Sequence, residues 1–105
     1  MSEIQYANLH MHSDVEPYEI IRRIGSKTIE IREMNYERVE SVELKWDVGG
    51  FAGHCINQND QQWIITPDET AKPIRARLRK DGRYHSVYGK HIISDEPIRF
   101  YDYNF

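Results

Sequence analysis

The chain has 105 residues, a length that suits one domain, residues 1–105, with one modest hydrophobic core. Hydrophobic residues make up 39% and charged residues 30%, a balance that excludes a disordered or membrane-spanning chain. No apolar run approaches the roughly 20 residues that cross a bilayer. The first residues lack a basic segment followed by an apolar one, so we expect neither a membrane partner nor a signal peptide. A single cysteine, Cys55, cannot form an internal disulfide, which predicts a reducing, cytoplasmic setting.

The net charge of −3 is unevenly distributed along the chain. Residues 1–50 carry ten acidic and six basic residues, whereas residues 72–91 carry seven basic residues and one acid, Asp81. A basic stretch on an acidic protein can bind a polyanion. It can equally be an ordinary solvated face, and the sequence leaves both interpretations open.

Alternating hydrophobicity predicts strands through most of the chain, and helical periodicity is weak. Residues 17–24 and 28–34 flank "GSK" and indicate two strands around a tight turn. In the second strand, Ile29 and Ile31 share one face. Residues 39–46 and 61–68 continue the strand pattern, and Pro67 ends the latter.

The clearest element is a hairpin within residues 72–87. Ile74, Ala76 and Leu78 alternate with arginines, and an Asp-Gly pair at 81–82 supplies a turn before Tyr84 begins the return strand. Further strands are expected over 88–94 and 97–105, with the terminal aromatic residues docked on the protein.

These segments amount to about seven or eight short strands, separated by turn residues. Their spacing predicts an all-β, mainly antiparallel meander that is closed or partly open as a small barrel. One short helix over residues 33–41 is left open.

The stretch "LHMHSD", residues 9–14, places two histidines two residues apart. HxHxD after a strand resembles the first ligand pair of amidohydrolases and of polymerase-and-histidinol-phosphatase-type phosphoesterases. Those families use much longer barrels and further ligand pairs, which this chain does not offer. We therefore predict no metal at His10 and His12, and interpret the stretch as a solvent-facing strand end.

A second stretch, "GGFAGH", is dense in glycine and cannot be a strand interior. One interpretation is a ligand-facing loop; the other is a bend at a barrel corner with Phe51 plugging one end. The residues of the candidate ligand loop are Gly49, Gly50, Phe51, Gly53 and His54. Cys55 beside His54 does not form a nucleophile–base pair, because adjacent strand residues point to opposite faces.

Four stretches together, "GGFAGH", "QQWIITPD", "IRARLRKDGRY" and the terminal "YDYNF", resemble a group of small uncharacterised proteins encoded by phages, prophages and plasmids. The resemblance covers roughly residues 13–105, while the acidic stretch 35–46 and "HMH" depart from it. It implies a mobile-element origin, a bacterial host cytoplasm and a barrel of SH3-like or KOW-like character. It implies no particular activity.

Three functions follow as hypotheses. The first is a non-catalytic protein-interaction module that contacts a host or phage protein through an acidic face made of Glu30, Glu33, Glu37, Glu40 and Glu43. The second is a nucleic-acid-binding barrel in which arginines contact phosphates and Tyr84, Tyr88 and Tyr101 stack on bases. Its predicted binding residues are Arg75, Arg77, Arg79, Lys80, Arg83, Tyr84 and Lys90. The third is a small-molecule binder or enzyme at the glycine-rich loop.

No nucleophile elbow, phosphate-binding loop or dinucleotide fingerprint occurs in the sequence, so we predict no catalytic residues and no cofactor. A homodimer through edge strands remains open.

Overall fold

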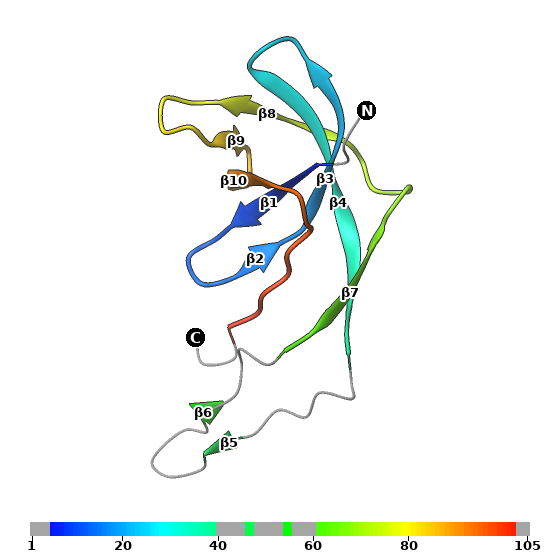
Figure 1. Ribbon diagram of the computed structural model, residues 1–105, viewed down its shortest axis with the longest axis vertical. Coiled ribbons are helices and arrows are strands. Elements are labelled where there is room, and N and C mark those ends of the chain that lie inside the picture. Colours follow the sequence, from blue (N-terminus) through cyan, green and yellow to red (C-terminus); the bar gives the residue numbers. More distant parts are fainter. Residues whose placement is uncertain (1–4, 40–45, 48–53, 56–60, 103–105) are drawn as a thin grey trace.

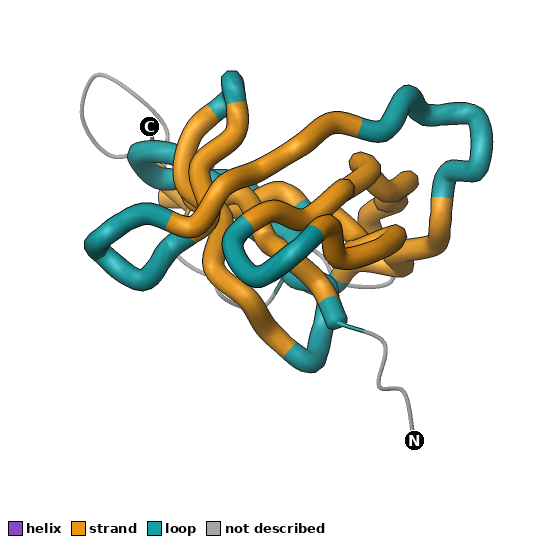
Figure 2. The backbone as a smooth tube through the Cα atoms, turned by 90° about the horizontal axis from the view of Figure 1, so that it is seen from above, coloured by secondary structure: helices purple, strands orange, loops and turns teal. Residues whose placement is uncertain are grey.

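The computed structural model describes residues 5–39, 46–47, 54–55 and 61–102 of the chain. Within these residues the protein consists of strands and loops without a helix (Figure 2). Its strands are β1 (Tyr6–His10), β2 (Val15–Glu16), β3 (Tyr18–Ile24), β4 (Thr28–Arg38), β5 (Trp46–Asp47), β6 (His54–Cys55), β7 (Trp63–Pro67), β8 (Ile74–Leu78), β9 (Tyr84–Ser86) and β10 (Gly89–Ser94). The predicted all-β, antiparallel fold is therefore confirmed.

Six of these strands close into a barrel, in the order β1, β10, β9, β8, β4 and β3 (Figure 1). The long pairing of β1 with β10 joins the first strand to the last, with Tyr6 opposite Ser94 and His10 opposite Lys90. The ring is completed where Tyr6 pairs with Glu19 of β3. The barrel is closed rather than partly open, because β1 finds a partner on each side.

Strand β4 extends beyond the barrel. Its first half pairs with β3 and β8, and its second half pairs with β7, where Met34 lies opposite Pro67 and Arg38 opposite Trp63 (Figure 1). The possible short helix over residues 33–41 therefore does not form at residues 33–38, which belong to β4. Hydrogen bonding to β7 keeps this stretch extended, and Val39 continues the contact through its N–H, which donates to the Gln62 carbonyl.

The core forms where the inward faces of the strands meet. Ile29 and Ile31 are almost fully buried on β4, as their alternation predicts, while Glu30 between them faces outward. The complete buried cluster comprises Ala7, Leu9, Tyr18, Ile29, Ile31, Ala76 and Tyr84. Each large apolar side chain in such a core contributes roughly 1.5–3 kcal/mol of burial free energy.

Both predicted hairpin turns are present. Gly25 (φ 75°) lies between β3 and β4, and Gly82 (φ 80°) lies between β8 and β9. In the second turn, the Arg79 N–H donates to the Arg83 carbonyl, and the Gly82 N–H donates to the Arg79 carbonyl. This is a three-residue hairpin loop whose last residue needs a left-handed backbone, which glycine adopts at little cost.

The C-terminal segment, residues 95–102, is not the strand expected over 97–105. It makes a single bridge to β2, where Val15 and Phe100 exchange two 2.9 Å backbone hydrogen bonds. The segment is nevertheless docked as far as Asp102, whose N–H donates to the Asp14 carboxylate over 2.8 Å. The last three residues and most of the predicted strand over 39–46 lie outside the described residues.

No helix among the described residues is long and apolar enough to cross a membrane.

Candidate nucleic-acid interface

The arginines of β8 lie on the outside of the barrel. Ala76 is fully buried, and its neighbours Arg75 and Arg77 are exposed because successive strand residues point to opposite faces. Arg79, Lys80 and Arg83 follow in the β8–β9 turn, and all are exposed. These basic residues are therefore accessible at the surface, and their binding of nucleic acid remains a prediction.

The strand register extends this basic surface across the barrel. Arg77 on β8 lies opposite His85 on β9, His85 lies opposite Lys90 on β10, and Lys90 lies opposite His10 on β1. Directly opposed residues of an antiparallel sheet project to the same side. We call these four residues, together with Arg79, Lys80 and Arg83 of the turn, the basic face.

Acidic partners are scarce on the basic face. In the described part of the chain, the ion pairs involve Arg22 with Glu30, Arg32 with Glu19, His85 with Asp81, and Arg99 with Glu16. None of these pairs includes Arg77, Arg83 or Lys90. The Asp81 carboxylate forms hydrogen bonds within the β8–β9 hairpin. It lies 2.9 Å from His85 Nε2 and accepts the Arg83 N–H at 2.9 Å. These hydrogen bonds, of which that from the Arg83 N–H acts most strongly, lower the pKa of Asp81 and keep it ionised.

Arg75, like His85, has an acid beside it. It pairs in register with Glu30 of β4, and Glu30 also forms a 3.4 Å ion pair with Arg22. Glu30 therefore partly neutralises the charge of Arg75.

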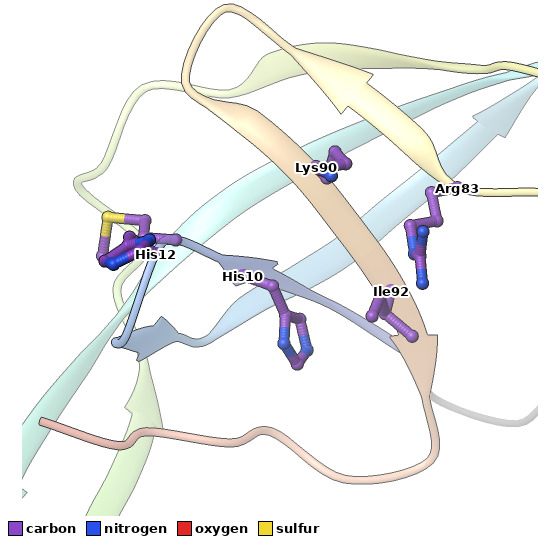
Figure 3. Close-up of a pocket in the computed structure, with 6 residues that line it drawn as sticks. His10, His12, Arg83, Lys90 and Ile92 are labelled. Carbon is purple, nitrogen blue, oxygen red and sulfur yellow. The ribbon is translucent and has the colours of Figure 1, made fainter. Parts of the chain in front are cut away.

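One end of the basic face contains an open pocket of about 400 Å³. His10, Lys90 and Arg83 lie around it together with His12, and Ile92 and Met11 provide its apolar lining (Figure 3). The pocket joins two features that lie far apart in sequence, the "HMH" stretch and the basic stretch. Partial burial and, secondarily, the positive charge of Arg83 lower the pKa of His10, which favours the neutral imidazole.

The prediction that Tyr84 stacks on bases is wrong. Leu78 faces inward and lies opposite Tyr84, so the Tyr84 ring also points into the barrel, where it is 8% exposed within the core cluster. Tyr88, in the β9–β10 turn, is 62% exposed and remains available for stacking. Tyr101 lies beside Arg99 rather than on the basic face.

The acidic face proposed from the sequence does not form as one surface among its described members. Glu30 is ion-paired with Arg22 on the barrel, whereas Glu33 and Glu37 lie an odd number of residues further along β4. Strand geometry therefore directs Glu30 to the opposite side from the other two. Glu40 and Glu43 lie outside the described residues.

The candidate ligand loop lies mostly outside the described residues, which include none of Gly49, Gly50, Phe51 and Gly53. Of His54, the structure describes the backbone, which pairs with Asp47 of β5. His10 ends β1, and Met11 begins a turn in which its N–H donates to the Asp14 carbonyl. Across the described residues, no group of three or more His, Cys, Asp or Glu side chains is placed to hold a metal.

A buried serine–histidine pair, for which the sequence carries no motif, lies beside this surface. His91 is fully buried, with Nδ1 2.9 Å from the Ala7 carbonyl and Nε2 2.7 Å from the Ser86 hydroxyl. Because a carbonyl only accepts, Nδ1 carries the hydrogen and Nε2 accepts one from Ser86. The Ser86 oxygen in turn accepts the Tyr88 N–H at 3.1 Å. This series of hydrogen bonds joins the β9–β10 turn to β1, and we assign it a structural role.

No protein-family model matches this chain, and no curated protein or solved structure matches it either.

Proposed function

We propose that this protein is a non-catalytic nucleic-acid-binding module and that the basic face is its binding surface. The observation that carries the proposal is the row Arg77, His85, Lys90 and His10, which the register places side by side across four strands. Phosphates along a nucleic-acid backbone repeat at regular spacing, so a row of hydrogen-bond donors on a rigid sheet, two of them the cations of Arg77 and Lys90, can contact several at once.

The chain as a whole carries a net charge of −3, so any binding must come from this local surface and not from general positive charge. Tyr88, which is exposed in the β9–β10 turn between His85 and Lys90, offers a ring for stacking on an unpaired base. This supports single-stranded nucleic acid as the first ligand to test.

The test is fluorescence anisotropy with labelled single- and double-stranded DNA and RNA. If about four phosphates of a duplex are contacted, affinity will fall about a hundredfold between about 50 and 200 mM salt. An Arg77→Ala/Arg83→Ala/Lys90→Ala variant is expected to abolish binding at the higher salt. Its matched control, Arg23→Ala/Arg38→Ala/Lys72→Ala, has the same net charge and is expected to retain binding. Absence of binding by the parent protein at low salt, or equal loss in both variants, would contradict the proposal.

A host or phage protein partner is the second candidate. It is favoured by Val87 and Tyr88, two apolar side chains that are 87% and 62% exposed at the tip of the β9–β10 turn. Capture of one partner that withstands high salt, and that a Val87→Ser/Tyr88→Ser variant no longer captures, would support it. The mobile-element origin, the bacterial cytoplasm and the SH3-like or KOW-like character of the barrel belong to this proposal as inferences from the resemblance.

A further inference from the structure

We infer that the pocket at the end of the basic face binds a terminal phosphate monoester of a nucleic-acid strand. This inference rests on the proposed function, and adds to it a preference for strand ends. Its basis is an open hollow of about 400 Å³ whose lining includes two histidines, an arginine and a lysine.

These four groups reach the pocket from three separate parts of the chain. His10 comes from β1 and His12 from the loop after it, Lys90 comes from β10, and Arg83 comes from the turn before β9 (Figure 3). In the view of Figure 3, His12 and Arg83 lie on opposite sides, with His10 and Lys90 between them. A ligand in the hollow can therefore be contacted from several directions, which a single strand of basic residues does not provide.

The charge of the pocket favours an anion. Its lining comprises His10, Met11, His12, Arg83, Lys90 and Ile92, and thus no acidic side chain among the described residues. Arg83 places a positive charge near His10, where it adds to the larger effect of burial in lowering the pKa of that imidazole. The two cations of the lining, Arg83 and Lys90, stabilise an anion in this hollow.

A terminal monoester suits this site better than a phosphate within the strand. A monoester carries about −1.5 to −2 charge near neutral pH and three free oxygens, so it can accept hydrogen bonds from several donors at once. An internal diester carries one charge and has two of its oxygens joined to the chain. Arginine and lysine donors on the terminal oxygens form charge-assisted hydrogen bonds, which are stronger than those between neutral groups.

The experiment compares one oligonucleotide sequence in three forms, with a 5′-phosphate, with a 3′-phosphate, and with hydroxyls at both ends. We expect the parent protein to bind one phosphorylated form about tenfold more tightly than the hydroxyl form. The two phosphorylated forms identify which end enters the pocket. Arg83→Gln and Lys90→Gln should each remove most of this preference. The matched control, Arg75→Gln, lies on the outside of the barrel but away from the pocket, and should leave the ratio unchanged.

The outcomes separate the two proposals. Equal binding of all three forms by the parent protein, or an unchanged ratio in both pocket variants, would overturn the terminal-phosphate site and leave the basic face intact as a nucleic-acid surface. No binding of any form at low salt would overturn both. Because Arg83 and Lys90 are exposed, both variants should have the same melting temperature as the parent protein.

A second measurement uses inorganic phosphate as the probe. Phosphate should shift the NMR signals of His10 in the parent protein, and Lys90→Gln should diminish that shift. Unchanged His10 signals would count against the site.

Discussion

The side chain of Asn8 accepts a hydrogen bond from the backbone N–H of Ile98 over 2.9 Å, and so joins β1 to the C-terminal segment. The same amide donates to the Glu96 carbonyl at 3.0 Å. Asn8 lies opposite Ile92 on the outward side of the β1–β10 pair, yet it is fully buried because the segment covers it. A polar residue at this position is satisfied by the covering backbone, which explains how a chain end without strand pairing stays docked.

Replacing Asn8 by leucine should therefore destabilise the fold. Asn8→Leu leaves the Ile98 N–H and the Glu96 carbonyl without partners, and we expect a loss of about 2 kcal/mol or more in the free energy of unfolding. Urea denaturation followed by circular dichroism measures it. The matched control, Asn35→Leu, changes an exposed position on β4 and should alter stability by less than about 0.5 kcal/mol. Similar losses in the two variants would show that the Asn8 hydrogen bonds do not hold the segment.

Arg99 provides the second attachment of the same segment. Its guanidinium carbon lies 4.3 Å from the centroid of the Tyr36 ring and 5.2 Å from that of Trp63. Arg99→Met keeps an apolar stem but removes the cation, and should cost about 1–2 kcal/mol of stability. In a Trp46→Phe background, the emission of Trp63 should shift to longer wavelength as water reaches its ring. Unchanged emission and stability would rule out this role for Arg99, for which Arg75→Met is the exposed control.

Buried His91 should make stability depend on pH. Burial, and to a smaller extent the charges of His85 and His10, lower the pKa of His91, while its hydrogen bond to Ala7 opposes the shift. At a pH below the ordinary histidine pKa of about 6.5, the unfolded chain binds a proton at His91 that the folded state resists. The contribution of His91 to stability is therefore fully present at neutral pH and falls as the solution is acidified. We expect the free energy of unfolding to be lower at about pH 5.5 than at about pH 7.5.

The control for this prediction must separate His91 from His10, whose pKa is lowered in the same direction. His91→Gln should be less stable than the parent at neutral pH and should lose less stability on acidification. His10→Gln measures the contribution of the pocket histidine alone. A His91→Gln variant that loses as much stability as the parent between the two pH values would place the titrating group elsewhere.

The Gly82 turn links stability to the basic face. A Cβ at Gly82 meets no atom within 4 Å, so Gly82→Ala is opposed only by the left-handed backbone at φ 80° and should cost about 1–2 kcal/mol. Gly25 has the same open surroundings at φ 75°, and Gly25→Ala should cost a similar amount. Since only Gly82 lies between Arg79 and Arg83, only its substitution should also weaken nucleic-acid binding. Equal effects of the two variants on binding, measured by anisotropy at a temperature where both are folded, would contradict this.

The local sequence pattern is sufficient to predict much of the barrel. Ile29 and Ile31 alternate with polar residues, and Gly25 and Gly82 supply left-handed turns, so the two hairpins and their inward faces could be predicted. The exposure of Arg75 and Arg77 followed in the same way from the small buried Ala76 between them. Each of these features depends on residues within one hairpin, where side-chain alternation and turn geometry act directly.

Tertiary contacts decided the rest. From the sequence alone, residues 33–38 can form a helix and Tyr84 can lie at the surface. Pairing with β7 holds residues 33–38 extended, and the register with Leu78 turns Tyr84 inward. The pocket depends on the pairing of His10 with Lys90, which brings the first strand beside the last. Alternation specifies which side chains share a face of one strand, but the neighbouring strand is chosen by the closure of the whole barrel. The amino-acid sequence by itself therefore determined the strands, the turns and the outward arginines, and only the tertiary structure brought the histidines of "HMH" beside Arg83 and Lys90.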